Sequence, residues 1–267
     1  MKDKIKVSAI VPVFNEEKTV AKVVAALLTS NQVDEVIVVN DGSIDKSLKK
    51  IKGFGKKIKL INLKKNMGKG YALAEGARKA LGEVVMFIDA DIVNLKQKNI
   101  KQLLEPVINH HWRAVVGVRK NIRMIPSPFA KLSGERVYYK EDLLEHLKQI
   151  RKTRFGVEIF LNHLFDNKPV KKISLMKLKG LYKYEKRDPA TAVKEYIDEG
   201  VEVARELARQ EKLLVEDLKI IERLKKATNF YEFKDIVKKI SNLRVREYLE
   251  KYVLKYLQKA KSWWQKW

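Results

Sequence analysis

Hydrophobic residues follow two alternating spacings over the first 120 positions of the chain. Short runs rich in Val and Ile are apolar throughout, which is typical of strands buried on both faces of a sheet. Between these runs, apolar residues recur at helical spacing. The alternation predicts an α/β fold with a mostly parallel sheet flanked by helices. The predicted strands are Ile5–Phe14, Glu35–Val39, Ile58–Leu63, Val84–Ile88 and Ala114–Val118, and the predicted helices are Glu16–Ser30, Ser43–Ile51, Gly70–Leu81 and Gln97–His111.

This rhythm changes after residue 120. Residues 121–134 contain Pro126, Pro128 and Gly134, which predict a loop over the carboxyl edge of the sheet. The pattern that follows predicts two helices and then an edge strand, over Val137–Ile150, Phe155–Phe165 and Val170–Leu178.

A second helical region begins at Asp188, a capping carboxylate followed by Pro189 in the first turn. The helical pattern continues to about Lys226. One straight helix of that length would run about 57 Å, so we expect a break in it. Further helical segments are predicted in 230–267. The change in composition predicts a domain over 1–185 and a helical C-terminal extension over 186–267.

Composition and charge limit the kinds of chemistry and the partners that the protein can have. The 267 residues include no cysteine, which excludes disulfides, thiolate metal sites and cysteine nucleophiles. Lys and Arg number 57 against 33 Asp and Glu, and the resulting formal charge of +24 is spread along the chain. Such a field favours anionic partners, among them nucleotides, phospholipid surfaces and nucleic acid. No apolar run has the length of a spanning helix or a signal peptide, so we expect a cytoplasmic protein, or one bound peripherally to the cytoplasmic membrane face.

Carboxylates follow three of the predicted strands, at the edge where open α/β sheets bind ligands. Glu16 follows the first strand, Asp41 ends the second, and Asp89 and Asp91 follow the fourth. Residues two apart on a strand point to one side and lie about 6.6 Å apart. Asp89 and Asp91 can therefore both face one Mg²⁺ or Mn²⁺ ion, which prefers oxygen ligands, or a nucleotide ribose. The alternative is a pair of ordinary loop acids, one of which caps the next helix.

Two glycine-containing turns accompany these acids. In Asp41-Gly42-Ser43, Ser43 is placed to cap the following helix while Asp41 accepts hydrogen bonds from a base. In Asn66–Gly70, two glycines permit close backbone approach to a phosphate and Lys69 adds charge. The second turn lacks the spacing of a nucleotide-triphosphate P-loop.

Four segments together carry a resemblance to a known family: VSAIVPVFNEE (7–17), VDEVIVVNDGSIDKS (33–47), NMGKGYALAEG (66–76) and VVMFIDADIVN (84–94). Their order and spacing resemble the family 2 glycosyltransferases, over about residues 5–180. The nearest branches look like polyprenyl-phosphate sugar synthases and glucosyl-phosphoglycerate synthases. The resemblance implies a GT-A type, Rossmann-like fold in which residues 1–120 bind the nucleotide sugar and 121–185 the acceptor.

The resemblance also implies roles for single residues. Asp41 reads the base, Asp89 lies near ribose and metal as the first acid of the D-x-D element, and Asp91 is the direct ligand of Mg²⁺ or Mn²⁺. Val93 departs from the polar metal ligand that lipid-phosphate mannosyl synthases often carry there, and Asn94 is a candidate substitute. A UDP-sugar, with glucose as the hexose, is the expected donor. The donor-binding set is Pro12, Phe14, Glu16, Asp41, Lys69, Asp89 and Arg119.

The acceptor side is predicted to lie around Ser133-Gly134-Glu135-Arg136. Glu135 is a candidate general base for a hydroxyl acceptor, and Arg136 a candidate ligand of an acceptor phosphate. Alternatively, the two form an ion pair that closes the loop. An acceptor that is already a phosphate, such as polyprenyl phosphate, needs no strong base. Glu158 matches a glutamate behind the family's acceptor site, and otherwise is a helix acid paired with a nearby cation.

The last segment, 243–267, combines an apolar stripe with interleaved lysines and ends in Trp263, Trp264 and Trp267. A basic amphipathic helix with terminal aromatic residues suits a membrane interface. The same stripe suits packing on the rest of the chain or on a second subunit.

Two other functions compete with sugar transfer. A sugar-phosphate nucleotidyltransferase also uses a Rossmann-like sheet and Mg²⁺, but normally opens with a glycine-rich loop where this chain has Pro12-Val13-Phe14-Asn15-Glu16. A nucleic-acid-binding protein would explain the charge but not the acids at the strand ends, which repel phosphate in the absence of a metal. No nucleic-acid partner is therefore expected. Retention or inversion at the anomeric carbon stays open.

Overall fold

The computed structural model describes residues 4–120, 132–211, 215–227, 230–255 and 257–258. The chain divides into two compact units. Unit 1 comprises 1–154 and 161–181, and unit 2 comprises 155–160 and 182–267. The division predicted at residue 185, between a glycosyltransferase-like domain and a helical extension, stays a prediction.

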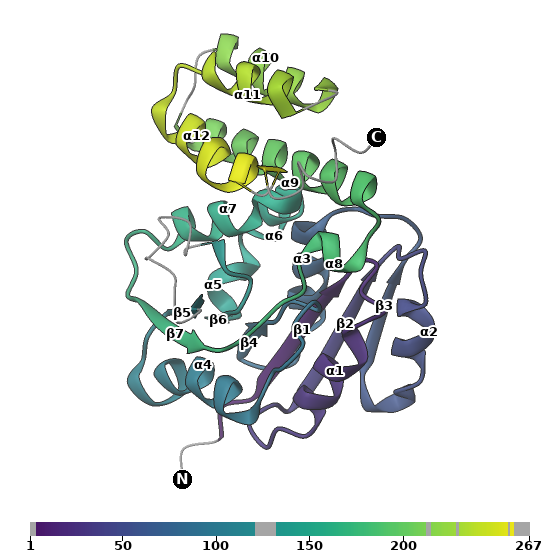
Figure 1. The fold of residues 1–267 in the computed structure, drawn as a ribbon. Helices are drawn as coiled ribbons and strands as arrows, with labels where there is room; N and C mark the ends of the chain where they lie inside the picture. The colour runs from purple at the N-terminus through teal and green to yellow at the C-terminus, as the bar shows by residue number, and fades with distance from the viewer. Residues whose placement is uncertain (1–3, 121–131, 212–214, 228–229, 256, 259–267) are drawn as a thin grey trace. The chain divides into compact units, whose positions relative to one another are not determined.

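Unit 1 is built on a seven-stranded sheet with the order β3-β2-β1-β4-β6-β5-β7 (Figure 1). Every neighbouring pair is parallel except the two pairs that β6 makes, with β4 and with β5. The strands are β1 (Val7–Val13), β2 (Glu35–Asp41), β3 (Lys59–Leu63), β4 (Val84–Phe87), β5 (Ala114–Lys120), β6 (Arg136–Tyr139) and β7 (Val170–Met176). The predicted mostly parallel α/β sheet is confirmed.

Helices cover both faces of this sheet. On one face, alternate residues of β1 such as Val7, Ala9 and Val11 are buried in a core shared with α1 and α4. On the other face, Gly76 of α3 lies against Ile10. The helices of unit 1 are α1 (Val20–Leu28), α2 (Ser47–Lys52), η1 (Gly55–Lys57), α3 (Lys69–Lys79), α4 (Gln97–His110), α5 (Glu141–Leu144), α6 (Leu147–Ile150) and η3 (Arg154–Gly156), whose last two residues belong to unit 2.

One predicted helix is wrong at its start. The pattern over 137–150 predicted a single helix, whereas Arg136–Tyr139 form β6 and only 141–144 and 147–150 are helical. Val137 and Tyr138 are buried because β6 lies in the middle of the sheet, with β4 and β5 on its two sides. The predicted edge strand is confirmed as β7, and the helix predicted over 155–165 forms as η3 followed by α7 (Val157–Leu164). Residues 121–131 of the predicted loop lie outside the described part of the chain.

Unit 2 is mostly helical. Asp188 caps α9 as predicted, since its carboxylate accepts a hydrogen bond from the Thr191 amide at 3.0 Å. The expected break follows Gln210, where α9 ends. The helices are α8 (Lys183–Lys186), α9 (Pro189–Gln210), α10 (Val215–Arg223), η4 (Leu224–Lys226), α11 (Phe230–Lys238), α12 (Leu243–Tyr248) and the π-helical η5 (Leu249–Leu254).

The apolar stripe of the C-terminal segment lies in the core of unit 2. Val245, Leu249, Val253 and Leu257 are all buried, and Val253 lies against Gly200 of α9. Packing within the chain therefore accounts for the described part of the stripe. The three tryptophans of the membrane prediction lie outside the described residues. No helix among the described residues is both long and apolar enough to cross a membrane.

Candidate active site

The sheet order explains why distant charged residues meet at one edge. Strands β1, β2, β4 and β5 all end there, because they run in one direction. Strand β6 runs the opposite way, so it begins there, with Arg136 opposite Phe87 of β4 and Val116 of β5. Glu135, just before β6, is therefore brought to the same edge as the acids that follow β4 and Arg119 of β5.

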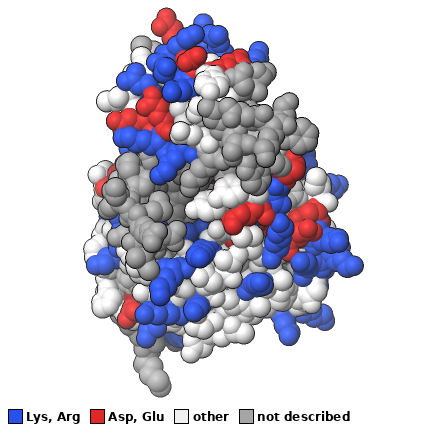
Figure 2. Space-filling model, in the orientation of Figure 1, with Lys and Arg blue, Asp and Glu red and all other residues white. Residues whose placement is uncertain are grey.

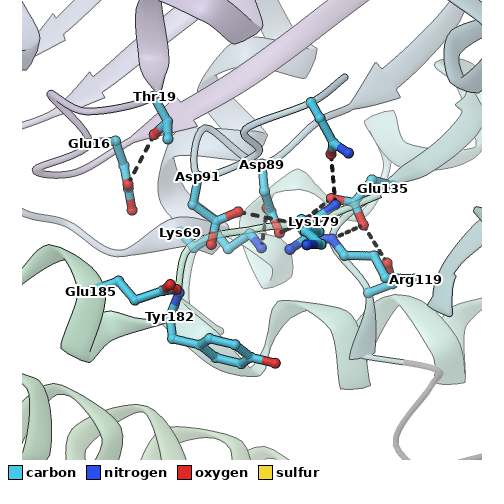
Figure 3. Close-up of polar contacts among 12 residues, drawn as sticks. Glu16, Thr19, Lys69, Asp89, Asp91, Arg119, Glu135, Lys179, Tyr182 and Glu185 are labelled. Carbon is cyan, nitrogen blue, oxygen red and sulfur yellow. Dashed lines mark hydrogen bonds and ion pairs between the residues drawn. The ribbon is translucent and has the colours of Figure 1, made fainter. Parts of the chain in front are cut away.

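Three carboxylates contact Arg119 near the end of β5 (Figure 3). Its Nη2 atom donates to Asp89 Oδ2 at 3.2 Å and to Asp91 Oδ1 at 3.3 Å. Its Nε atom donates to Glu135 Oε2 at 3.0 Å, and Nη2 also contacts Glu135 Oε1. Lys69, at the start of α3, places its Nζ 2.6 Å from Asp89 Oδ1. The structure thus brings together five residues that the sequence predicted: Lys69, Asp89, Asp91, Arg119 and Glu135.

Glu135 is the most enclosed member of this cluster, with no exposed side-chain surface. Ser133 Oγ donates to its Oε2 at 2.6 Å, so both carboxylate oxygens accept hydrogen bonds. Burial alone would lower the pKa of Arg119, but the carboxylates of Glu135, Asp91 and Asp89 hold that pKa well above its usual value. A fixed positive charge therefore lies between the D-x-D acids and Glu135 at every accessible pH.

We expect Glu135→Gln to lower the free energy of unfolding by about 1–3 kcal/mol, because a buried charged acceptor loses its charge beside Arg119. The matched control is Glu247→Gln, which alters an exposed ion pair with Lys251 of 3.0 Å. The control should change stability by about 0.5 kcal/mol or less. Urea denaturation measures both. Equal effects of the two substitutions would show that the Arg119–Glu135 pair adds no particular stability.

Asp41 lies apart from this cluster, at the end of β2. Its two carboxylate oxygens accept hydrogen bonds from the amides of Met67 (2.7 Å) and Gly68 (2.8 Å). Burial raises the pKa of Asp41, although these two amides and the charge of Arg154 oppose the rise. Asp41 therefore fixes the turn that precedes α3, and this turn leads directly to Lys69.

The ends of β1 and β2 are held together by side-chain hydrogen bonds. Asn15, in a left-handed conformation with φ of 56°, accepts from the Ile44 amide at 2.8 Å, and its own amide donates to Ser43 Oγ at 3.0 Å. The Glu16 amide donates to Ser47 Oγ at 2.8 Å. Ser43 thus links the strand ends and does not cap α2, which corrects its predicted capping role. Pro12, Phe14 and Glu16 are all half-buried in this region.

A segment that sequence reasoning missed, residues 177–181, runs beside the D-x-D acids. The Leu181 amide donates to the Asp91 carbonyl at 3.0 Å, and the Val93 amide donates to the Lys179 carbonyl at 3.0 Å. Asn94 donates to the Lys177 carbonyl and accepts from the Lys179 amide, each at 2.8 Å. Both ends of the Asn94 amide are therefore engaged by this backbone.

Glycines at two positions allow the charged groups to approach closely. A Cβ on Gly134 would lie 2.5 Å from the carboxyl carbon of Asp89 and nearer still to its oxygens. A Cβ on Gly180 would lie 2.9 Å from Asp91 Oδ1 and would contact the guanidinium of Arg119. The sequence did not predict these close approaches. Each glycine is required by a contact with residues distant in the sequence, and no local pattern reveals such a contact.

The two residues predicted for the acceptor, Arg136 and Glu158, are both buried. Arg136 is buried, and it donates to the Ser133 carbonyl (2.7 Å), to Tyr138 Oη (3.0 Å) and to Asn162 Oδ1 (3.0 Å). Glu158 is buried in the first turn of α7, in the segment that belongs to unit 2.

Comparison with known proteins identifies the family to which the chain belongs. The family model described as glycosyl transferase family 2 matches residues 8–174. The chain belongs to glycosyl transferase family 2. The match spans β1 through most of β7, and so includes every charged residue of the cluster around Arg119.

Curated family 2 relatives match the N-terminal part of the chain. Dodecaprenyl-phosphate galacturonate synthase of Rhizobium johnstonii is 30% identical, over 46% of this chain and 40% of that protein. A dolichyl-phosphate beta-glucosyltransferase of Trichomonas vaginalis is 33% identical, over 44% and 41%. The matched region covers about half or less of each relative's length.

Among solved structures, glucosyl-3-phosphoglycerate synthase from Mycobacterium tuberculosis is similar, with a TM-score of 0.55 and 24% identity. The similarity covers 67% of this chain and 72% of that one. It confirms the GT-A type fold that the sequence motifs predicted.

Asp89 and Asp91 are the two carboxylates that the sequence predicted as ligands of a divalent cation. No group of three or more potential metal-binding side chains occurs among the described residues. Two carboxylates suit Mg²⁺ or Mn²⁺, which commonly take one or two protein carboxylates and complete their shell with water and substrate phosphate. His163 is exposed, and its Nδ1 atom lies 3.3 Å from Asp166 Oδ2.

Proposed function

We propose that this chain is a metal-dependent hexosyltransferase that moves a sugar, glucose or a related hexose, from a nucleoside diphosphate sugar to an acceptor that carries a phosphate or hydroxyl group. The observation that carries the proposal is the cluster of Asp89, Asp91, Lys69 and Arg119 at the carboxyl edge of the sheet. Acids and cations gathered there suit a diphosphate bound together with a cation. Family membership and the names of the relatives support it.

On the donor side, we assign Asp41 to the base and Pro12, Phe14 and Glu16 to the nucleoside. The same edge of unit 1 carries these residues and Asp89, because β1, β2 and β4 end together. A UDP-sugar is favoured as the donor, since the similar mycobacterial enzyme was crystallised with UDP-glucose and Mn²⁺.

Asp89 and Asp91 are the residues that would hold Mg²⁺ or Mn²⁺. A bound cation would supply electrostatic stabilisation of the leaving nucleoside diphosphate. Lys69 and Arg119 add positive charge from the chain itself. Arg119 is already oriented by Glu135 on one side and the D-x-D acids on the other, so little reorganisation is needed to present its charge to a phosphate.

On the acceptor side, the geometry favours an acceptor that arrives as a phosphate. Both oxygens of Glu135 accept hydrogen bonds from Arg119 and Ser133, and its side chain has no exposed surface, so Glu135 is poorly placed to meet a hydroxyl acceptor. The names of the Rhizobium and Trichomonas relatives specify a lipid-phosphate product or acceptor, and the mycobacterial structures include one with phosphoglyceric acid. The general-base role of Glu135 and the acceptor roles of Arg136 and Glu158 stay predictions.

The proposal assigns 1–120 to the donor, 121–185 to the acceptor, and 186–267 to a helical extension. The cytoplasmic, peripheral location also stays a prediction. Val245, Leu249, Val253 and Leu257 are buried, so a membrane contact made by segment 243–267 would have to use other side chains of that segment.

A donor-hydrolysis screen tests the proposal. The full chain is incubated with UDP-, GDP- and dTDP-sugars and Mg²⁺ or Mn²⁺, and release of the nucleoside diphosphate is measured. We expect release from at least one donor, and none when the metal is chelated. Formation of a sugar nucleotide and pyrophosphate from a sugar phosphate and a nucleoside triphosphate, without hydrolysis of any donor, would instead identify a nucleotidyltransferase.

A further inference from the structure

A surface of unit 1 outside the candidate active site is strongly basic. Between Lys46 and Lys65 the chain contains nine lysines and no Asp or Glu. Eight of these lysines are exposed, on α2, on η1 and after β3. We call this surface the lysine patch, formed by Lys46, Lys49, Lys50, Lys52, Lys56, Lys57, Lys64 and Lys65.

The charge of the lysine patch is not neutralised within the described part of the chain. Lys50 Nζ donates to the Glu17 carbonyl at 2.6 Å, and no ion pair joins a lysine of the patch to a described carboxylate. The neighbouring acids are bound to backbone amides: Glu17 accepts from Lys46, and Asp45 accepts from Glu17 and Ser47. The patch therefore presents a net positive field to its surroundings.

The lysine patch adjoins the donor edge of the sheet. Asp41 holds the amides of Met67 and Gly68, and a Cβ on Gly42 would lie 2.7 Å from the Cα of Lys65. Lys64 and Lys65 therefore lie next to the end of β2. Figure 2 shows Lys and Arg side chains gathered on the flank where Figure 1 places α2, with a few acids beside them.

The composition of the patch indicates which anionic partner it fits. The segment 44–65 contains no arginine, and its one aromatic residue, Phe54, packs against the core. Sequence-specific and single-strand nucleic-acid recognition draw on arginine forks and stacking aromatic rings, and segment 44–65 supplies neither to the surface. Lysines give a diffuse attraction to a charged surface without specific geometry. Ile44, 90% exposed, adds an apolar side chain beside Lys46.

We propose that the lysine patch binds the surface of a membrane that contains anionic phospholipids. The attraction is the summed field of the exposed lysines, each of which contributes independently near an anionic surface. This inference goes beyond the proposed function and does not depend on it, since vesicle binding requires neither a donor nor a metal.

Vesicle co-sedimentation of the full chain tests the proposal. The patch variant carries Lys49→Gln, Lys52→Gln, Lys56→Gln and Lys57→Gln. The matched control removes the same charge from exposed lysines elsewhere in unit 1: Lys98, Lys101, Lys148 and Lys172, each changed to Gln. The vesicles are phosphatidylcholine alone or phosphatidylcholine mixed with phosphatidylglycerol.

The wild type should bind the mixed vesicles in preference to phosphatidylcholine, and added salt should weaken the binding. The patch variant should bind the mixed vesicles at least about tenfold more weakly than the wild type. The control variant should bind them about as well as the wild type. Thermal unfolding should show both variants folded. Equal loss in the two variants, or no preference for anionic lipid, would overturn the proposal. So would patch-dependent binding of an RNA oligonucleotide without vesicle binding, or binding lost only on replacing Trp263, Trp264 and Trp267.

Discussion

Asp91→Asn should reduce donor turnover on the order of 10²–10³-fold, because the leaving diphosphate loses the electrostatic stabilisation that a cation on this carboxylate would supply. The substitution keeps the shape of the side chain and removes its charge. Asp91 Oδ1 also loses its ion pair with Arg119, so Arg119 stays held mainly by Glu135 and Asp89. Steady-state release of the nucleoside diphosphate measures the change.

Asp166→Asn is the matched control, since it removes an exposed carboxylate that pairs with His163 outside the cluster. Its turnover should equal that of the wild type. Mn²⁺ affinity, followed by electron paramagnetic resonance without donor, should fall for Asp91→Asn and not for the control. Near-normal turnover of Asp91→Asn in a metal-dependent reaction would remove Asp91 from the proposed metal site.

Gly134→Ala should lower donor turnover about 10²-fold, because the added methyl group and the Asp89 carboxylate cannot occupy the same space. The backbone of Gly134 is outside the left-handed region, so alanine meets no conformational strain there. The expected effect is therefore displacement of Asp89, and with it of the contacts to Lys69 and Arg119.

The control for this substitution is Gly53→Ala, whose Cβ would lie 3.2 Å from the Lys50 carbonyl and far from the cluster. We expect wild-type turnover from it, and closely similar thermal unfolding of both variants. If Gly134→Ala kept full activity, Asp89 would not need its observed position, and the cluster would be irrelevant to transfer.

The sequence predicted the repeating strands and helices well, because each is set by a local hydrophobic pattern. It failed at β6, where Arg136–Tyr139 lie within apolar spacing that also suits a helix. The strand forms because β4 and β5 supply hydrogen-bonding partners on both sides. Those partners are distant in sequence, so no local pattern reveals them.

The sequence also predicted the charged residues of the site, but not the contacts that arrange them. Strand-end logic and family resemblance identified Asp89, Asp91, Lys69, Arg119 and Glu135, and the structure brings these five together. The link between Arg119 and Glu135 depends on antiparallel β6, which was missed. The role of Gly180 depends on the backbone of 177–181 crossing beside Asp91, a contact between segments some 90 positions apart in the chain.

We propose above all that the D-x-D acids and a divalent cation together bind a sugar nucleotide. The decisive measurement is titration calorimetry of UDP-glucose into the full chain with saturating Mn²⁺, with GDP- and dTDP-sugars as further titrants. We predict saturable uptake of at least one sugar nucleotide, abolished by chelation of Mn²⁺ and strongly weakened in Asp91→Asn. No uptake of any sugar nucleotide, or equal uptake by Asp91→Asn, would contradict the claim.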